Sequence, residues 1–162
     1  MAAVDYFLKI EGIEGESMDD KHPKEIQLES WSWGETQSGS HAAGMGGGAG
    51  KVSMQDFHFV MPVNKASPKL MLACATGEHI KKAVLTCRKA GKEQQEFLVY
   101  TFSDLIVSSY QTGGSHGASV LPTEQISLNF SKIETEYKAQ KPDGGLDSPV
   151  KAGYDLKKNV KV

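Results

Sequence analysis

The sequence feature that most constrains the fold is a change of face within segments that otherwise alternate like β-strands. Ile26 and Leu28 share one face of an extended chain, whereas Trp31 and Trp33 lie on the other face. The same change recurs in two further segments, 51–61 and 124–138. A change of face needs a bulge or two different buried environments along one strand. We therefore expect strands that serve the core of the chain at one end and a neighbouring surface at the other, as in the subunit of an assembly.

Alternation of apolar and polar residues predicts a mainly β domain that spans the whole chain, 1–162. Expected strands are 3–10, 25–37, 51–61, 80–89, 95–103 with a continuation to 111, 124–138 and, after a linker at 139–152, about 154–160. Because the stretch 97–102 is apolar on both faces, we expect cover on both sides of it. This pattern is typical of a curled antiparallel β-barrel or a two-sheet sandwich.

One convincing helix is expected, at about 67–77. Ser67 can act as its N-cap, Pro68 suits its first turn, and Gly77 can end it. A helix of about ten residues is not stable alone in water, so it must lie against a sheet. The fold class is therefore mainly β with one short flanking α-helix.

The formal net charge of −2 argues against binding of nucleic acid through electrostatics. Residues 1–30 carry an excess of acidic side chains, and residues 138–162 carry an excess of lysines. Two interpretations stay open: the ends are simply solvated, or they are complementary surfaces of stacked copies. We expect Asp19 and Asp20, in a charged loop, to be solvated.

The N-terminal stretch carries Asp5 inside its short apolar run and has no cleavage-like site, so we expect no signal peptide. No apolar run approaches the roughly 18 residues that could span a membrane, so we expect no stable membrane insertion. Cys74 and Cys87 do not make a disulfide framework. These observations predict synthesis in the cytoplasm, and export by a route that needs no signal stays open.

A glycine-rich run at 39–50 contains Gly44-Met-Gly46-Gly-Gly-Ala49, which fits the spacing of a dinucleotide-binding fingerprint. That fingerprint requires a helix directly after it. The chain from Lys51 onward alternates like a strand instead. We therefore interpret the run as a protruding loop that packs on a neighbour.

Other patterns of catalytic or binding residues are weak. Cys74, His79 and Cys87 lack the close pairing typical of zinc ligands, and Cys74 lies in an apolar setting that does not favour a reactive thiolate. Trp31 and Trp33 could form a platform for a sugar or a base, but their acidic strand favours a position in the core. We expect no enzyme, no cofactor and no metal site.

With these residues considered, the chain resembles the haemolysin-coregulated protein (Hcp) family, the inner-tube subunits of bacterial type VI secretion. The resemblance runs from end to end. It rests on ordered motifs: Asp5-Tyr-Phe-Leu-Lys-Ile10, Gly15-Glu-Ser17, Ser30-Trp-Ser-Trp-Gly34, Gly48-Ala-Gly-Lys51, Lys65-Ala-Ser-Pro-Lys-Leu-Met71, Arg88-Lys-Ala-Gly91, Thr112-Gly-Gly-Ser115, Leu128-Asn-Phe130 and Lys151-Ala-Gly-Tyr154.

The resemblance implies hexameric rings that stack into a tube inside a contractile sheath and beneath a spike protein. Firing would expel the tube, so the protein would be cytoplasmic on synthesis and then secreted. Small effector proteins would be carried and protected in the lumen. Two alternatives stay open: a phage-like tail tube subunit, and a small-ligand-binding β-barrel module that uses the tryptophans.

The resemblance also suggests positions for the functional residues. If Trp31 and Trp33 point into the core, then Ser30 and Ser32 point away from it, and we expect them to face the lumen and its cargo. Contacts between rings or subunits are expected from the glycine-rich loop, the 91–92 turn and the lysine-rich end. The candidates are Gly39, Gly44, Gly46, Gly47, Gly48, Gly50, Gly91, Lys92, Lys157 and Lys158.

Overall fold

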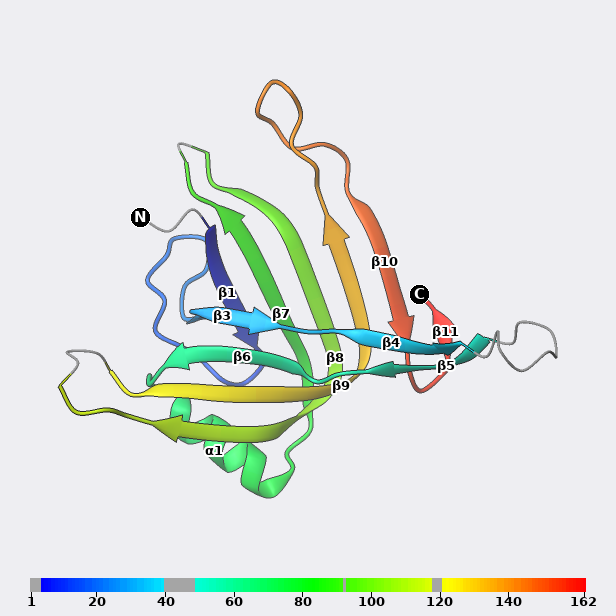
Figure 1. Ribbon diagram of the computed structural model, residues 1–162. Coiled ribbons are helices and arrows are strands. Elements are labelled where there is room, and N and C mark those ends of the chain that lie inside the picture. The colour runs from blue at the N-terminus through cyan, green and yellow to red at the C-terminus, as the bar shows by residue number, and fades with distance from the viewer. Residues whose placement is uncertain (1–3, 40–48, 92, 118–120) are drawn as a thin grey trace.

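The computed structural model describes residues 4–39, 49–91, 93–117 and 121–162. Figure 1 shows the arrangement of its elements. In chain order they are β1 (Val4–Ile10), β2 (Ile26–Gln27), β3 (Ser30–Ser32), β4 (Glu35–Gly39), β5 (Ala49–Met54), β6 (Phe57–Pro62), α1 (Ser67–Thr76), β7 (Ile80–Lys89), β8 (Gln95–Gly113), β9 (Thr123–Tyr137), β10 (Val150–Asp155) and β11 (Val160–Lys161).

Most of the strands form one curled antiparallel sheet. Along its hydrogen-bonded path the order is β11–β10–β9–β8–β7–β1–β2, and β9 also pairs with β6, which pairs with β3. The β2 end of this path and the β6–β3 branch meet where the chain runs from β2 to β3. There the Leu28 amide donates to Tyr6 at 3.0 Å and the Glu29 amide donates to Val60 at 2.9 Å. The predicted fold class is confirmed, with a sheet that curls without closing into a complete barrel.

The change of face around the tryptophans reflects a change of pairing partner. β2 pairs with β1, β3 pairs with β6, and β4 pairs with β5, so the predicted strand 25–37 is three short strands. Ile26 and Leu28 are buried, and both indoles are half-buried against the same core. The expectation that one half of this segment serves a neighbouring surface is therefore wrong, because both faces serve the core of one chain.

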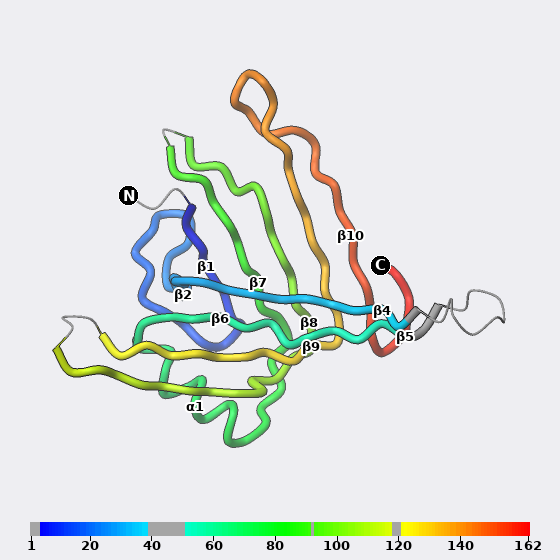
Figure 2. The backbone as a smooth tube through the Cα atoms, viewed as in Figure 1, coloured from blue at the N-terminus to red at the C-terminus, as the bar shows by residue number. Residues whose placement is uncertain are grey.

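The second change of face is also a break between two strands. The predicted strand 51–61 is β5 followed by β6, and at the break the Gln55 amide donates to the Gly34 carbonyl at 2.9 Å. In the described part of the chain, β4 and β5 pair only with each other. Figure 2 shows them in line with β3 and β6. We call β4 and β5 the ribbon; it leaves the curled sheet and crosses in front of β8, β9 and β10 in Figure 1.

The third change of face occurs inside β9, which remains one strand but bends. Its first half pairs with β6 and its second half with β10, while β8 accompanies both halves. At the bend, Asp104 of β8 has a left-handed backbone conformation (φ 52°), and its carbonyl accepts a hydrogen bond from the Ser131 hydroxyl at 3.0 Å. Phe130 and Ile133, on either side of the bend, are buried in the same core. In β9 too, residues from both faces of the strand pack into the same core.

Helix α1 lies beside β8 at the lower side of the molecule in Figure 1, with Leu70 buried in the core. Gly77 ends the helix in a left-handed conformation (φ 66°), as predicted. The predicted N-cap is wrong. Ala66 is the cap residue, and the Ser67 hydroxyl instead accepts a hydrogen bond from the Asn64 amide at 3.0 Å.

Two predictions about later strands are also wrong. β10 begins inside the expected linker, and the expected strand 154–160 covers only the end of β10, a turn and the start of β11. The expected cover on both faces of 97–102 is not found among the described residues. Phe102 is buried, whereas Val99 and Thr101 line a surface pocket on the other face, where their neighbours are Glu134 and Glu136 of β9. Long charged side chains replace a covering layer there.

The polar loop between β1 and β2 folds back over the outer side of β1 and β7. His22 stacks on Phe7 with ring centroids 4.6 Å apart, and Arg88 of β7 pairs with Asp19 at 2.7 Å. The expectation that Asp19 is solvated is therefore wrong, because a buried guanidinium holds it. Asp20 is exposed, as predicted.

Candidate functional site

The strongest candidate for a functional site is the outward face of four strands: β3, β6, the first half of β9 and the second half of β8. Their pairing places outward side chains in rows across the sheet. The central row holds Ser32, His58, Ser127 and Ser109. The next row holds Ser30, Val60, Gln125 and Gln111. We call these two rows the polar face.

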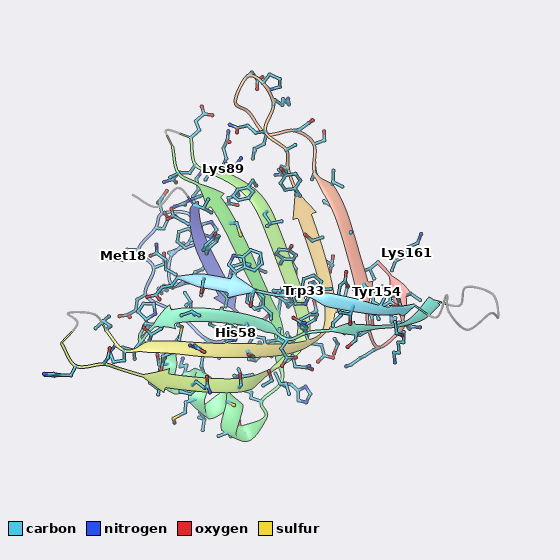
Figure 3. The ribbon with its side chains drawn as sticks, in the orientation of Figure 1. Met18, Trp33, His58, Lys89, Tyr154 and Lys161 are labelled. Atoms are coloured by element: carbon cyan, nitrogen blue, oxygen red, sulfur yellow. The ribbon has the colours of Figure 1, made fainter. Side chains whose placement is uncertain are left out.

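Strict alternation along β6 places His58 on the polar face. Phe57 and Phe59 are fully buried, so the imidazole between them projects from the opposite side of the strand. Figure 3 shows His58 on β6, beside β9. Its Nδ1 atom lies 3.2 Å from the Ser127 hydroxyl oxygen, within hydrogen-bond distance. Neither row contains a lysine or an arginine.

The carboxylate beside the polar face accepts one hydrogen bond on each of its oxygens. Asp56 lies two residues before His58, and its two oxygens accept hydrogen bonds from Ser108 at 2.6 Å and from Asn129 at 2.8 Å. These two donors come from β8 and β9, so the carboxylate ties the three strands together at the end of the face. The polar face therefore offers hydroxyl, amide and imidazole groups and very little free charge.

The opposite, buried face of the same strands carries one carboxylate. Glu124 of β9 is 1% exposed and accepts a hydrogen bond from the Tyr110 hydroxyl of β8. Burial, together with this hydrogen bond to a carboxylate, raises the pKa of Tyr110 to about 12. Glu124 is fully buried and Tyr110 half-buried, and the pair does not reach the polar face.

Both lateral edges of these four strands are open. β3 has β6 as its only strand partner, and beyond Leu105 β8 pairs only with β9, within the part of the chain that the structure describes. An open edge presents unpaired backbone donors and acceptors that another strand can satisfy. The polar face thus extends from one open edge to the other.

The predicted lumen residues Ser30 and Ser32 are exposed and lie on the polar face. The same alternation, applied to residues 57–61, also predicts that His58 lies on this face. Sequence reasoning also missed Ser109 and Ser127, whose place in the row depends on pairing between distant strands. The cargo role of Ser30 and Ser32 stays a prediction.

The predicted contact residues between rings are spread over several places. Gly44, Gly46, Gly47, Gly48 and Lys92 lie outside the described residues. Gly39 and Gly50 belong to the ribbon, and Gly91 lies in the exposed turn between β7 and β8.

At the lysine-rich end, Lys157 forms an ion pair with Asp104 of its own chain, whereas the Lys158 side chain is exposed. This contact, with that of Ser131, holds the pKa of Asp104 below its usual value. Lys157 is therefore only partly free to contact a neighbour.

The tryptophans do not form an exposed platform. Trp31 lies between Tyr6, Phe57 and Tyr100, with ring centroids 5.5–6.2 Å away. Trp33 lines a cleft of about 300 Å³ between the ribbon and the strands β8, β9 and β10. Its indole nitrogen is buried and has no hydrogen-bond partner among the residues that the structure describes. Figure 3 shows Trp33 where the ribbon crosses these strands.

The two cysteines are not paired with each other and differ in burial. Cys87 is buried, and desolvation raises the pKa of its thiol to about 12, which disfavours the reactive thiolate. Cys74 is half-buried rather than buried.

Among the described residues, no three His, Cys, Asp or Glu side chains gather as metal ligands would. Within the same residues, no helix is both long and apolar enough to cross a membrane.

Strand edges without a second partner, on either side of a nearly uncharged face, are typical of structural β domains that can associate with other chains. Comparison with known proteins agrees. The family model described as "Type VI secretion system effector, Hcp" matches residues 7–137. The chain therefore belongs to the Hcp family, the secreted tube proteins of type VI secretion.

Individual relatives support the same assignment. The chain is 48% identical over 162 residues to protein hcp1 of Pseudomonas aeruginosa, with 99% of each sequence covered. The crystal structure of Hcp1 from Salmonella typhimurium is similar with a TM-score of 0.80 at 40% identity, over 99% of this chain and all of that one. A structure described as a type six secretion system protein has a TM-score of 0.94 at 30% identity, over 99% of this chain and 100% of that one.

Proposed function

We propose that copies of this chain join edge to edge into hexameric rings, with the polar face lining a lumen. The observation that carries the proposal is the pair of open edges, β3 and the second half of β8, on either side of one four-stranded face. Pairing β3 of one copy with β8 of the next would satisfy both edges at once, and repeated pairing closes a ring.

The rings then stack into the inner tube of a type VI secretion apparatus. Membership of the Hcp family supports this step, and the projecting ribbon supplies a segment that can reach a neighbouring ring. In this proposal, contraction of the sheath expels the tube behind its spike, and effector proteins travel inside the lumen. The chain transfers mechanical displacement and cargo and makes or breaks no covalent bond.

Cysteine pairs across the proposed seam test the ring. We would combine Ser32→Cys on β3 in turn with Ser109→Cys, Gln111→Cys and Gly113→Cys on β8, in a Cys74→Ser background. Paired residues of adjacent antiparallel strands have Cα atoms about 4.5–5.5 Å apart, which suits a disulfide. Within one chain, Ser32 and Ser109 are separated by three strand spacings, about 14 Å, which excludes an internal bond.

Oxidation should yield a ladder of covalent oligomers up to the hexamer for at least one pair. The control combines Ser32→Cys with Ser103→Cys, which lies on β8 between β7 and β9 and away from the open edge. Monomers for all three pairs, or an equal ladder for the control, would contradict edge pairing.

A further inference from the structure

The outward face of the four strands carries a row whose charge can change. The central row holds three serines and one histidine, and it runs without interruption from β3 to β8, that is, from one open edge to the other. If the ring of the proposed function closes through these edges, the rows of successive copies surround the lumen. A single histidine per copy then becomes a circle of imidazoles.

His58 is the titratable group at the centre of this row. Its Nδ1 atom lies 3.2 Å from the Ser127 hydroxyl oxygen, and its side chain is half-exposed. Histidine is the side chain that ordinarily changes charge between about pH 8 and pH 5. Protonation would convert a neutral row into a cationic one, since no other side chain in the row titrates in that range.

The carboxylates near His58 lie outside its row, and two of them already have hydrogen-bond partners. Asp56, directly before β6, accepts hydrogen bonds from Ser108 and Asn129. Glu29 precedes β3 and is exposed, and Glu124 of β9 lies on the buried face with Tyr110. In the proposed ring, each copy adds one such positive charge to the wall of the lumen, and these charges raise the positive potential that an acidic occupant meets.

We infer that this row is a pH-dependent recognition belt for acidic polypeptide surfaces, an inference that rests on the proposed ring. At neutral pH the belt holds a polypeptide only through uncharged hydrogen bonds. As the pH falls through the histidine range, the belt becomes cationic, strengthens its hold on acidic segments and repels basic ones. The chemistry of the belt thus selects cargo by charge only under acidic conditions.

A rhodamine-labelled octa-aspartate peptide is a suitable probe, because its carboxyl groups remain ionised at pH 5.5. Fluorescence anisotropy with the assembled protein should show at least about tenfold tighter binding at pH 5.5 than at pH 7.5, at constant ionic strength. His58→Gln should bind equally weakly at both pH values. His58→Lys should bind tightly at both, since its charge is permanent. His79→Gln removes an exposed histidine outside the row and should behave as the unmodified protein does.

Light scattering on the same samples distinguishes a failure of the proposed belt from a failure of the proposed ring. If the protein forms rings and His58→Gln retains the full pH dependence, the belt is wrong and the ring stands. Unmodified rings that bind the peptide equally at both pH values overturn the belt as well. A protein that stays monomeric contradicts the proposed ring, and the belt with it.

Discussion

A single buried guanidinium organises the outer side of β1 and β7. Arg88 is 2% exposed, donates to both carboxylate oxygens of Asp19 at 2.9 Å and 2.7 Å, and lies 4.7 Å from the centre of the Phe7 ring. Asp5 is a longer partner at 3.4 Å. The hydrogen bonds from Arg88 hold the pKa of Asp19 well below its usual value. The sequence shows an acidic pair in a loop, but it gives no sign that one member has a partner 69 residues away.

Asp19→Asn should lower the free energy of unfolding by about 2 kcal/mol at pH 7, because Arg88 loses a charged acceptor. The difference from the unmodified protein should shrink below about pH 4. There the unfolded chain protonates Asp19 while the folded chain resists it, so the carboxylate stops contributing stability. Urea unfolding at pH 7, 4 and 3 measures this. Asp20→Asn, at the exposed neighbour, should change little; a pH-independent gap for Asp19→Asn would refute the linkage.

At the scale of elements, three changes of face were visible in the sequence, but their cause was not. Alternation identified each position, yet it could not distinguish a break between strands from a bend within one. The partner of each half is decided by pairing with β1, β6 or β10, and the β1 and β6 partners lie about 20 to 70 residues away in the chain. For the same reason alternation placed Ser30 and Ser32 on the outward face but could not assemble them with Ser109 and Ser127 into one row.

The bend between the halves of β8 and β9 depends on Asp104. Its left-handed φ of 52° is tolerated by aspartate and strained for a β-branched residue. Asp104→Val should therefore lower the free energy of unfolding by about 1–3 kcal/mol in urea titrations. Ser103→Val changes a neighbouring residue in regular strand geometry and should have a much smaller effect. Equal effects of the two substitutions would show that the bend does not depend on this conformation.

At the scale of the whole molecule, the curled sheet gathers the apolar residues into one core and leaves a polar face with an open edge on each side. A face with so little charge does not repel its own copies when they are arranged around a common axis. Open edges give those copies a geometry in which backbone hydrogen bonds define the seam. Family membership could be inferred from sequence motifs, whereas the edges and the continuous row required the strand pairing.

The mass of the protein in solution, measured by light scattering, tests the central claim of edge-to-edge assembly most directly. We predict a mass close to six times the 17.6 kDa of one chain, with ring-shaped particles in electron micrographs of the same sample. Hydrogen bonds between backbone groups depend much less on salt concentration than exposed ion pairs do. The mass should therefore change little as the salt concentration rises. A mass of one chain across the same range of concentration and salt would contradict the account.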